Sequence, residues 1–241
     1  MNFTFLFWRL LAAHFIGDYI LQTDTIFSIK VKYRWGVILH SLIAGIVIFI
    51  FAIPYLSHYP ILWLYLFLNL LLHILVDKGK LLLNPKVKKV GFIFFLLDQI
   101  IHIGLCWLIS AAVPSSPYYG TSLPLYNNTT LMIFISVYIG VTYGVLYLIN
   151  SIKTSFNLPV TFPKWGMKSV EFLERAAITT FVFLGGYFYF LIPVAIFPRG
   201  FLSFVKKSRY RADAFDLIFG LLFSLIAGSL LRIAVNIFGG L

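Results

Sequence analysis

The chain has 241 residues, of which 61% are hydrophobic and only 11% charged, and its mean hydropathy is +0.95. Soluble domains contain about 45–50% apolar and about 25% charged residues, so this composition excludes an ordinary soluble fold. The net charge of +11 would suggest a nucleic-acid partner in a soluble protein. Here the basic residues lie mostly between apolar segments, so we interpret them as topology signals and headgroup contacts and expect no nucleic acid.

The apolar segments are long enough to cross a bilayer, because roughly 20 mostly apolar residues span a core of ~30 Å. The sequence therefore predicts an all-α, polytopic transmembrane helical bundle with about seven hydrophobic segments. We expect them at residues 3–22, 35–56, 60–78, 91–113, 130–150, 174–197 and 214–237. The first segment is not read as a signal peptide, because His14 and Asp18 interrupt its apolar run.

The loops predict the orientation and divide a single membrane domain into three parts. Residues 1–113 form a four-helix N-terminal part, 114–130 an external loop without Lys or Arg, and 131–241 the C-terminal membrane helices with basic loops. The loops after segments one, three and five are rich in lysine and are expected on the cytoplasmic side. Their basic residues are Lys30, Lys32, Arg34, Lys78, Lys80, Lys86, Lys88, Lys89, Lys153, Lys164 and Lys168.

One basic stretch does not fit simple alternation. Residues 198–212 contain five Lys or Arg residues but would fall on the external side. Two explanations stay open. Either segment six is a re-entrant pair of half-helices, broken at Gly185-Gly186 and again near Pro193, or the basic stretch is an interfacial helix on the unexpected side.

The first four segments contain a cluster of histidine and aspartate residues. Ionisable groups are costly inside a membrane and usually face a bundle interior or a cavity. Several of them are spaced i,i+4 and so share a helix face. Taken in order along the four segments, the residues are His14 and Asp18, then His40, then His73 and Asp77, then Asp98 and His102.

The predicted depths of these residues agree with one another. With ~1.5 Å of rise per residue and the orientation above, the four antiparallel segments place their polar groups in one layer near the cytoplasmic boundary. Chance placement would scatter them through both leaflets. We therefore predict one shared site, which includes every histidine of the chain except His58.

Four histidines and three aspartates on rigid helices form a nitrogen and oxygen ligand set suited to a divalent metal, with Zn²⁺ first and Mn²⁺ or Fe²⁺ as alternatives. The set is large enough for one metal with supporting partners or for two. A metal would activate water towards an ester, amide or phosphoester at the headgroup layer. The expected substrate-binding residues are Lys78, Lys80, Gln22 and Gln99.

Two other interpretations of the cluster stay open. Aspartate and histidine chains are the usual relay residues of proton and cation pathways, which would make the protein a coupled transporter. Interhelical polar contacts also stabilise membrane bundles without any chemistry, which would make it a non-catalytic scaffold. Outside the cluster, Glu171, Glu174 and Arg175 predict a charged helix start with an i,i+4 ion pair from Glu171 to Arg175.

Three motifs carry a resemblance to a known family. They are the run His14-Phe15-Ile16-Gly17-Asp18-Tyr19-Ile20-Leu21-Gln22, the spacing His73-x-x-x-Asp77-x-x-Lys80, and the run Asp98-Gln99-x-x-His102. With His40, they resemble a widespread, uncharacterised family of bacterial inner-membrane proteins that is known only as a domain of unknown function. The resemblance implies a multi-pass protein of the bacterial cytoplasmic membrane.

The family name supplies no chemistry. The histidine and aspartate spacing is similar, at the level of residue types, to a separate group of membrane-bound metal-dependent hydrolases. It differs from the histidine-rich boxes of membrane di-iron hydroxylases. We therefore expect metal-dependent hydrolysis of a lipid or lipid-linked substrate as the leading function, with membrane lipids as partners and proton- or cation-coupled transport as the main alternative.

Overall fold

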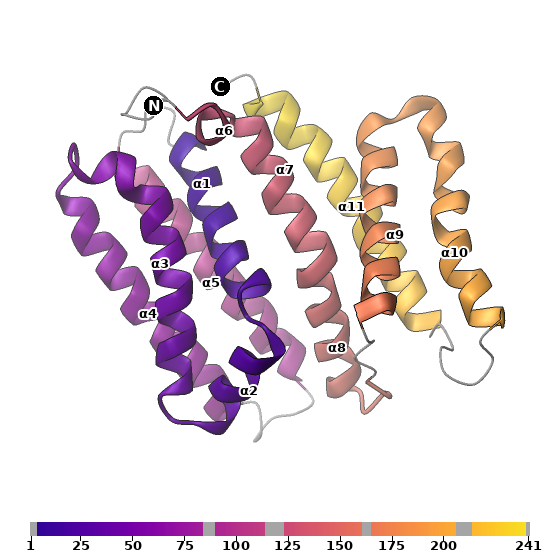
Figure 1. Ribbon diagram of the computed structural model, residues 1–241, viewed down its shortest axis with the longest axis horizontal. Coiled ribbons are helices and arrows are strands. Elements are labelled where there is room, and N and C mark those ends of the chain that lie inside the picture. Colours follow the sequence, from indigo (N-terminus) through magenta and orange to yellow (C-terminus); the bar gives the residue numbers. More distant parts are fainter. Residues whose placement is uncertain (1–3, 84–89, 114–122, 161–164, 206–213, 240–241) are drawn as a thin grey trace.

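The computed structural model describes residues 4–83, 90–113, 123–160, 165–205 and 214–239. In this part of the chain the regular structure is entirely helical, as expected, and the helices lie roughly side by side (Figure 1). Lys86, Lys88, Lys89, Lys164 and most of the expected loop 114–130 lie outside the described residues.

The N-terminal part contains four long helical elements and one short helix that lies across them. In chain order these elements are α1 (Thr4–Phe15) with its π-helical continuation η1 (Ile16–Ile20), α2 (Asp24–Lys32), α3 (Gly36–Leu56), α4 (Ile61–Leu83) and α5 (Gly91–Ala112). The axis of α2 is bent by 80° from that of α1 and η1. The Thr23 side chain caps α2 by accepting a hydrogen bond from the Ile26 amide.

Helix α2 was not expected, because residues 23–34 were read as a loop. The segment has too few apolar residues to span a membrane, and none of its residues is buried. Its amphipathic pattern and its Thr23 cap are nevertheless sufficient for a short helix that rests on α3.

The C-terminal part begins with one long helical run and continues into a hairpin and a final helix. Its elements are α6 (Pro124–Asn127), α7 (Thr129–Ile139), the π-helical turn η3 (Gly140–Gly144), α8 (Val145–Ser155), α9 (Trp165–Leu184), the 3-10 turn η4 (Gly186–Leu191), α10 (Ile192–Val205) and α11 (Ala214–Phe238). Helix α11 packs along α9, and α10 also packs on α9.

The prediction of a single helix over residues 174–197 is wrong. Helix α9 starts earlier and ends at Leu184, and the chain then turns through Gly185 and Gly186, whose φ values are 70° and 58°. Residues other than glycine rarely adopt this left-handed backbone conformation. Of the two explanations left open, the structure shows the break at Gly185-Gly186, and α9 and α10 form a hairpin (Figure 1).

The hairpin also bears on the basic stretch 198–212, of which only residues 198–205 are described. Helices α4, α8 and α10 end, and α5 and α11 begin, at one end of the bundle, which we call the basic end (the lower end in Figure 1). Because α9 and α10 run in opposite directions, the C-terminal end of α10 and the N-terminal end of α11 both lie at the basic end. The residues between them, 206–213, are outside the described part of the chain.

Within the described ranges, five helical runs are long and apolar enough to cross a membrane. They are α3, α4, α5, the continuous run Thr129–Ser155 and α11. The bent pair of α1–η1 and α2 would make a sixth if it counts as one span. The bounds of these runs agree closely with the expected segments, although α4 and α8 each extend about one turn further towards the basic end.

The end of the bundle opposite the basic end is filled by an apolar core. Buried side chains of α1, α3, α4 and α5 form it, and these include Phe5, Leu6, Leu10, Ile48, Ala52, Tyr55, Leu62, Cys106, Ile109 and Val113. This end also contains a charged side chain, that of Arg9, which is fully buried. Its guanidinium donates to the Tyr126 carbonyl at 2.6 and 2.9 Å and stacks on the Phe5 ring, 3.2 Å from the ring centroid. Arg9 thus fixes α6 to α1.

Candidate metal centre

Helix α1 and its continuation η1 supply His14 and Asp18, both of them buried. Gly17 lies between them where η1 approaches α3 very closely. A Cβ atom at residue 17 would lie 2.6 Å from the Ala44 Cα, so only glycine permits this approach. The contact brings the Asp18 carboxylate to the face of α3 that carries His40.

Helices α4 and α5 each present a polar stripe to the same point. On α4, Asn69, His73 and Asp77 are separated by four residues each, and all three are buried. On α5, Asp98 and His102 have the same spacing and are also buried. All seven predicted ligand residues therefore meet in one cluster near the basic end, which we call the His/Asp cluster. This arrangement agrees with the prediction that the seven residues share one site.

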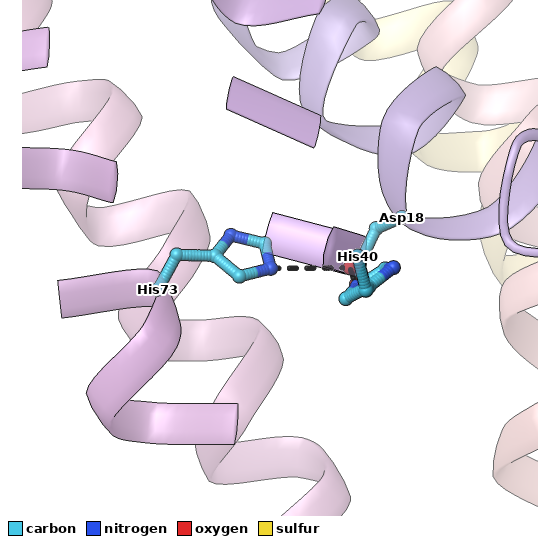
Figure 2. Close-up of side chains that lie close together, drawn as sticks. All are labelled: Asp18, His40 and His73. Atoms are coloured by element: carbon cyan, nitrogen blue, oxygen red, sulfur yellow. Dashed lines mark hydrogen bonds and ion pairs between the residues drawn. The ribbon is translucent and has the colours of Figure 1, made fainter. Parts of the chain in front are cut away.

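The first part of the His/Asp cluster consists of two imidazoles between two carboxylates. The His40 Nε2 lies 2.9 Å from Asp18 Oδ1 and 3.5 Å from Asp77 Oδ2. The His73 Nε2 lies 3.5 Å from the same Asp18 oxygen and 3.4 Å from the same Asp77 oxygen. Figure 2 shows the His73 ring reaching from α4 towards the Asp18 carboxylate, which His40 contacts as well.

The second part of the cluster adjoins the first through stacked rings. The ring centroids of His73 and His102 are 4.2 Å apart, and those of His14 and His102 are 5.1 Å apart. The His102 Nε2 lies 3.3 Å from Asp98 Oδ1. The four imidazoles therefore form a continuous group, and His73 joins its two parts.

Several ring nitrogens of this group have no partner in hydrogen-bonding geometry among the described residues. These buried atoms are Nε2 of His14, His73 and His102 and Nδ1 of His40. An unpaired polar group is costly in a buried site, so native proteins pair nearly all of them. Unpaired imidazole nitrogens that face carboxylates are the donor atoms that a divalent metal requires.

Two lysines neutralise part of the carboxylate charge. The Lys30 Nζ lies 2.7 Å from Asp77 Oδ2, and the Lys80 Nζ lies 2.7 Å from Asp98 Oδ2. Lys30 was expected only as a positive loop residue, and nothing in the sequence indicated that α2 would carry it to the cluster. If the four histidines are counted as neutral, the three aspartates and two lysines give the cluster a net charge of −1.

The predicted substrate-binding residues lie in different environments. Gln99 is buried and donates to Asp18 Oδ2 and Asp98 Oδ2, both at 3.2 Å, and accepts a hydrogen bond of 2.8 Å from the Tyr19 hydroxyl. Gln22 accepts from Lys30 at 3.2 Å. Lys80 is 22% exposed, and Lys78 is exposed. Gln99 and Gln22 thus form hydrogen bonds with other residues of the site, whereas Lys78 and Lys80 are exposed or partly exposed.

The donor atoms fit a divalent ion. Two overlapping groups, Asp18 with His40 and His73, and His73 with Asp77 and His102, each bring one ligand atom per residue to within 4.8 Å of the others. The four nitrogen–oxygen distances around His40 and His73 are 2.9–3.5 Å. Neighbouring ligands of an ion with bonds near 2.1 Å are separated by about 3.0–3.4 Å.

A second buried polar group, which we call the arginine cluster, lies between α8, α9, α10 and α11. The expected ion pair from Glu171 to Arg175 is confirmed, with Oε2 and Nη2 3.6 Å apart. Arg199 of α10 adds contacts of 3.1 Å to Glu171 and 3.4 Å to Glu174. Beside them, Lys153 of α8 and Asp216 of α11 form a pair at 2.7 Å.

The fold and the site define a helical protein with several membrane-length apolar helices and one buried histidine and aspartate cluster near a single end. The chain belongs to a family described as a protein of unknown function, DUF3307, whose model matches residues 6–134. The matched region contains all seven residues of the His/Asp cluster. This confirms the resemblance to an uncharacterised family that the sequence motifs indicated.

Neither the curated proteins nor the solved structures contain a match to this chain.

Proposed function

We propose that this protein is a membrane-embedded, metal-dependent hydrolase that acts on a lipid or lipid-linked substrate at the cytoplasmic face of the membrane. The observation that carries the proposal is the convergence of four buried histidines and three buried aspartates, several of whose ring nitrogens lack a hydrogen-bond partner. Buried imidazole nitrogens without a hydrogen bond, close to carboxylates, are donor atoms that suit a divalent metal.

The residues of the cluster divide into those that would hold the metal and those that would orient them. Asp18, His40, His73 and Asp77 supply the closest set of ligand atoms, and His14, His102 and Asp98 supply further donors. When bound, a divalent ion would supply Lewis acidity and an activated water. Gln99 would hold two carboxylates in place, as partners of metal ligands commonly do.

Lysine side chains at the rim favour an anionic substrate. Lys80 is partly exposed beside Asp98, and Lys78 is exposed two residues earlier in α4. A phosphate group at the headgroup layer would meet these ammonium groups before it reached the buried histidines. We therefore favour a phosphate-bearing lipid over a neutral one.

The position of the site follows from the positive-inside rule. The basic end carries Lys30, Lys32, Arg34, Lys78, Lys80 and Lys153. Cytoplasmic loops carry such an excess of lysine and arginine. The proposal therefore places the basic end in the cytoplasm of a bacterial cell and the His/Asp cluster at the inner leaflet of its cytoplasmic membrane.

The main alternative is a proton- or cation-coupled transporter, which the uncompensated negative charge of the cluster favours. Transport needs a polar path to the other face of the membrane. On the buried face of α5, however, His102 is followed by Cys106 and Ile109 and then by Val113 at the end of the helix. On the buried face of α1, Leu6 and Leu10 come before His14. This largely apolar packing, which only separate polar residues such as Arg9, Asn69 and Ser110 interrupt, favours hydrolysis, and the unpaired ring nitrogens disfavour a scaffold.

The test is lipid turnover by the purified protein in sealed vesicles of phosphatidylglycerol and phosphatidylethanolamine, with Zn²⁺ or Mn²⁺ added. We expect metal-dependent release of a lipid fragment that is lost in His40→Ala and kept in His58→Ala, whose histidine lies in the α3–α4 turn. Metal- or proton-driven flux across the vesicles without any turnover would replace the proposal by the transporter.

A further inference from the structure

Helix α2 is too short to cross a membrane and lies across the bundle at its basic end (Figure 1). Its 9 residues extend about 14 Å, whereas a bilayer core is ~30 Å thick. The 80° bend from α1 and η1 turns its axis away from the direction of the bundle. Because α2 ends at Lys32 and the membrane-length helix α3 begins at Gly36, α2 lies at the level where α3 enters the bilayer.

Two contacts hold α2 in this position. A Cβ atom at residue 36 would collide with the Ile29 carbonyl, so Gly36 lets the last turn of α2 rest directly on the start of α3. The Lys30 Nζ lies 2.7 Å from Asp77 Oδ2 and 3.2 Å from Gln22 Oε1. Helix α2 is therefore attached both to α3 and to the His/Asp cluster.

The remaining surface of α2 has an apolar face and a polar face. The side of the helix that carries Lys30 is partly buried. Phe27 and Val31 are spaced i,i+4, share a second face and are 49% and 57% exposed. Ser28 and Lys32 have the same spacing, share a third face and are exposed as well. A helix with one apolar and one polar exposed face suits the boundary between acyl chains and water.

Aromatic and basic side chains continue this pattern between α2 and α3. Tyr33 and Trp35 are 44% and 52% exposed, and their ring centroids are 5.5 Å apart in a stacked arrangement. Arg34, between them in the chain, is exposed. Tyrosine and tryptophan are enriched at membrane–water interfaces, and lysine and arginine attract headgroup phosphates. The exposed apolar residues then continue on α3 with Ile38 and Leu42.

We propose that α2 is an interfacial helix that binds the phospholipid surface at the basic end, with Phe27 and Val31 among the acyl chains and Lys32 at the level of the phosphates. The apolar face of such a helix is buried about 5–10 Å into the boundary between headgroups and acyl chains. Because Lys30 contacts Asp77, this attachment would also hold α2 against the His/Asp cluster. The inference does not depend on the proposed hydrolysis or on a metal in the cluster.

The inference is tested with the full chain in vesicles of phosphatidylglycerol and phosphatidylethanolamine. In a Cys106→Ala background, a fluorophore is attached at Val31→Cys or at Ser28→Cys, both at exposed positions of α2. Quenching by a phospholipid with a nitroxide on its acyl chain is compared with quenching by aqueous iodide. We expect the ratio of lipid quenching to iodide quenching to be several-fold higher at residue 31 than at residue 28.

A matched pair of substitutions tests the apolar face itself. Val31→Asp places a charge on this face and should lower the quenching ratio of a fluorophore at Phe27→Cys several-fold. Thr25→Asp, at an exposed position on the polar side of α2, should leave that ratio unchanged. Circular dichroism shows whether each variant keeps its helices, so that a loss of lipid contact is distinguished from a loss of fold.

Equal quenching ratios at residues 28 and 31 would overturn the inference, because α2 would then lie in water. A ratio at residue 27 that Val31→Asp does not lower in the folded protein would overturn it as well. So would a fluorophore at residue 31 that neither quencher reaches, because a second copy of the chain would then cover the apolar face in place of lipid.

Discussion

The His/Asp cluster and the arginine cluster are both buried among helices near the basic end, but they differ in the chemistry of their side chains. The arginine cluster contains three acidic and three basic residues, namely Glu171, Glu174, Asp216, Lys153, Arg175 and Arg199, so its formal charges balance. Its basic residues are arginines and a lysine, which offer no lone pair to a metal while they are charged. The His/Asp cluster instead contains four imidazoles, whose ring nitrogens can offer a lone pair to a metal, and three carboxylates beside two lysines.

This difference separates a structural role from a chemical one. Ion pairs in the arginine cluster connect α9 to α10 and α8 to α11, and Gly220 of α11 leaves room for two guanidinium groups. Both clusters contain buried atoms without a hydrogen bond among the described residues, but in the His/Asp cluster four of these atoms are imidazole nitrogens, whereas in the arginine cluster they are Glu174 Oε2, Arg175 Nε and Asp216 Oδ1. We therefore propose a stabilising role for the first cluster and metal binding for the second.

The largest expected effect comes from removing a charge from the arginine cluster. Arg199→Ala leaves Glu171 and Glu174 buried without their shared partner, which should cost about 3–5 kcal/mol. We expect a large drop in the midpoint of thermal unfolding in detergent. Arg34→Ala, which removes an exposed arginine, is the control and should change little. Equal midpoints for the two variants would show that the arginine cluster is not structural.

The next effect concerns stabilisation by metal. If Zn²⁺ binds the folded protein, Zn²⁺ at 100 times its Kd should stabilise it by about 2.7 kcal/mol. Differential scanning fluorimetry should show a higher midpoint for the wild type with Zn²⁺ than with a chelator. His73→Ala should lose this difference, and Lys32→Ala, on the exposed face of α2, should keep it. A shift that survives in His73→Ala would place the metal elsewhere.

A smaller effect is expected from Gly17→Ala. The added Cβ would lie 2.6 Å from the Ala44 Cα and would push η1 away from α3, which separates Asp18 from His40. We expect Zn²⁺ affinity to fall about tenfold or more, as for other changes that disturb the orientation of ligands. Gly104→Ala on α5 is a matched control, because its Cβ would meet nothing within 4 Å. Competition titration against a fluorescent chelator measures the Zn²⁺ affinity of both variants. Equal affinities would contradict the view that Gly17 lets Asp18 approach His40.

The smallest expected effect is that of Tyr19→Phe, which removes the 2.8 Å hydrogen bond to Gln99. A single hydrogen bond contributes about 0.5–1.5 kcal/mol, so Zn²⁺ affinity should fall about two- to tenfold in the same titration. Tyr138→Phe removes a comparable hydrogen bond, to Thr180, which lies outside the His/Asp cluster, and should leave the Zn²⁺ affinity unchanged. An equally large loss of Zn²⁺ affinity in Tyr138→Phe would mean that both substitutions act through the general stability of the protein.

The sequence predicted the long helices well because their apolar runs coincide with the bounds of α3, α5 and α11. It also predicted that the seven residues of the His/Asp cluster lie together, since i,i+4 spacing fixes a helix face and a common depth fixes the layer. It could not predict Lys30 as a partner of Asp77, because that contact depends on the 80° bend before α2. Arg199 was missed because its partners on α9 lie across a hairpin that apolar length alone does not reveal.

The most direct test of the central claim is elemental analysis of the detergent-purified protein, made without a metal-binding affinity tag. Wild type is compared with His73→Ala, Asp98→Ala and, as control, His58→Ala. We predict about one or two Zn, Mn or Fe per chain in the wild type and in His58→Ala, and a loss in the other two variants. No metal in the wild type, even after metal is added back at neutral pH, would contradict the metal centre.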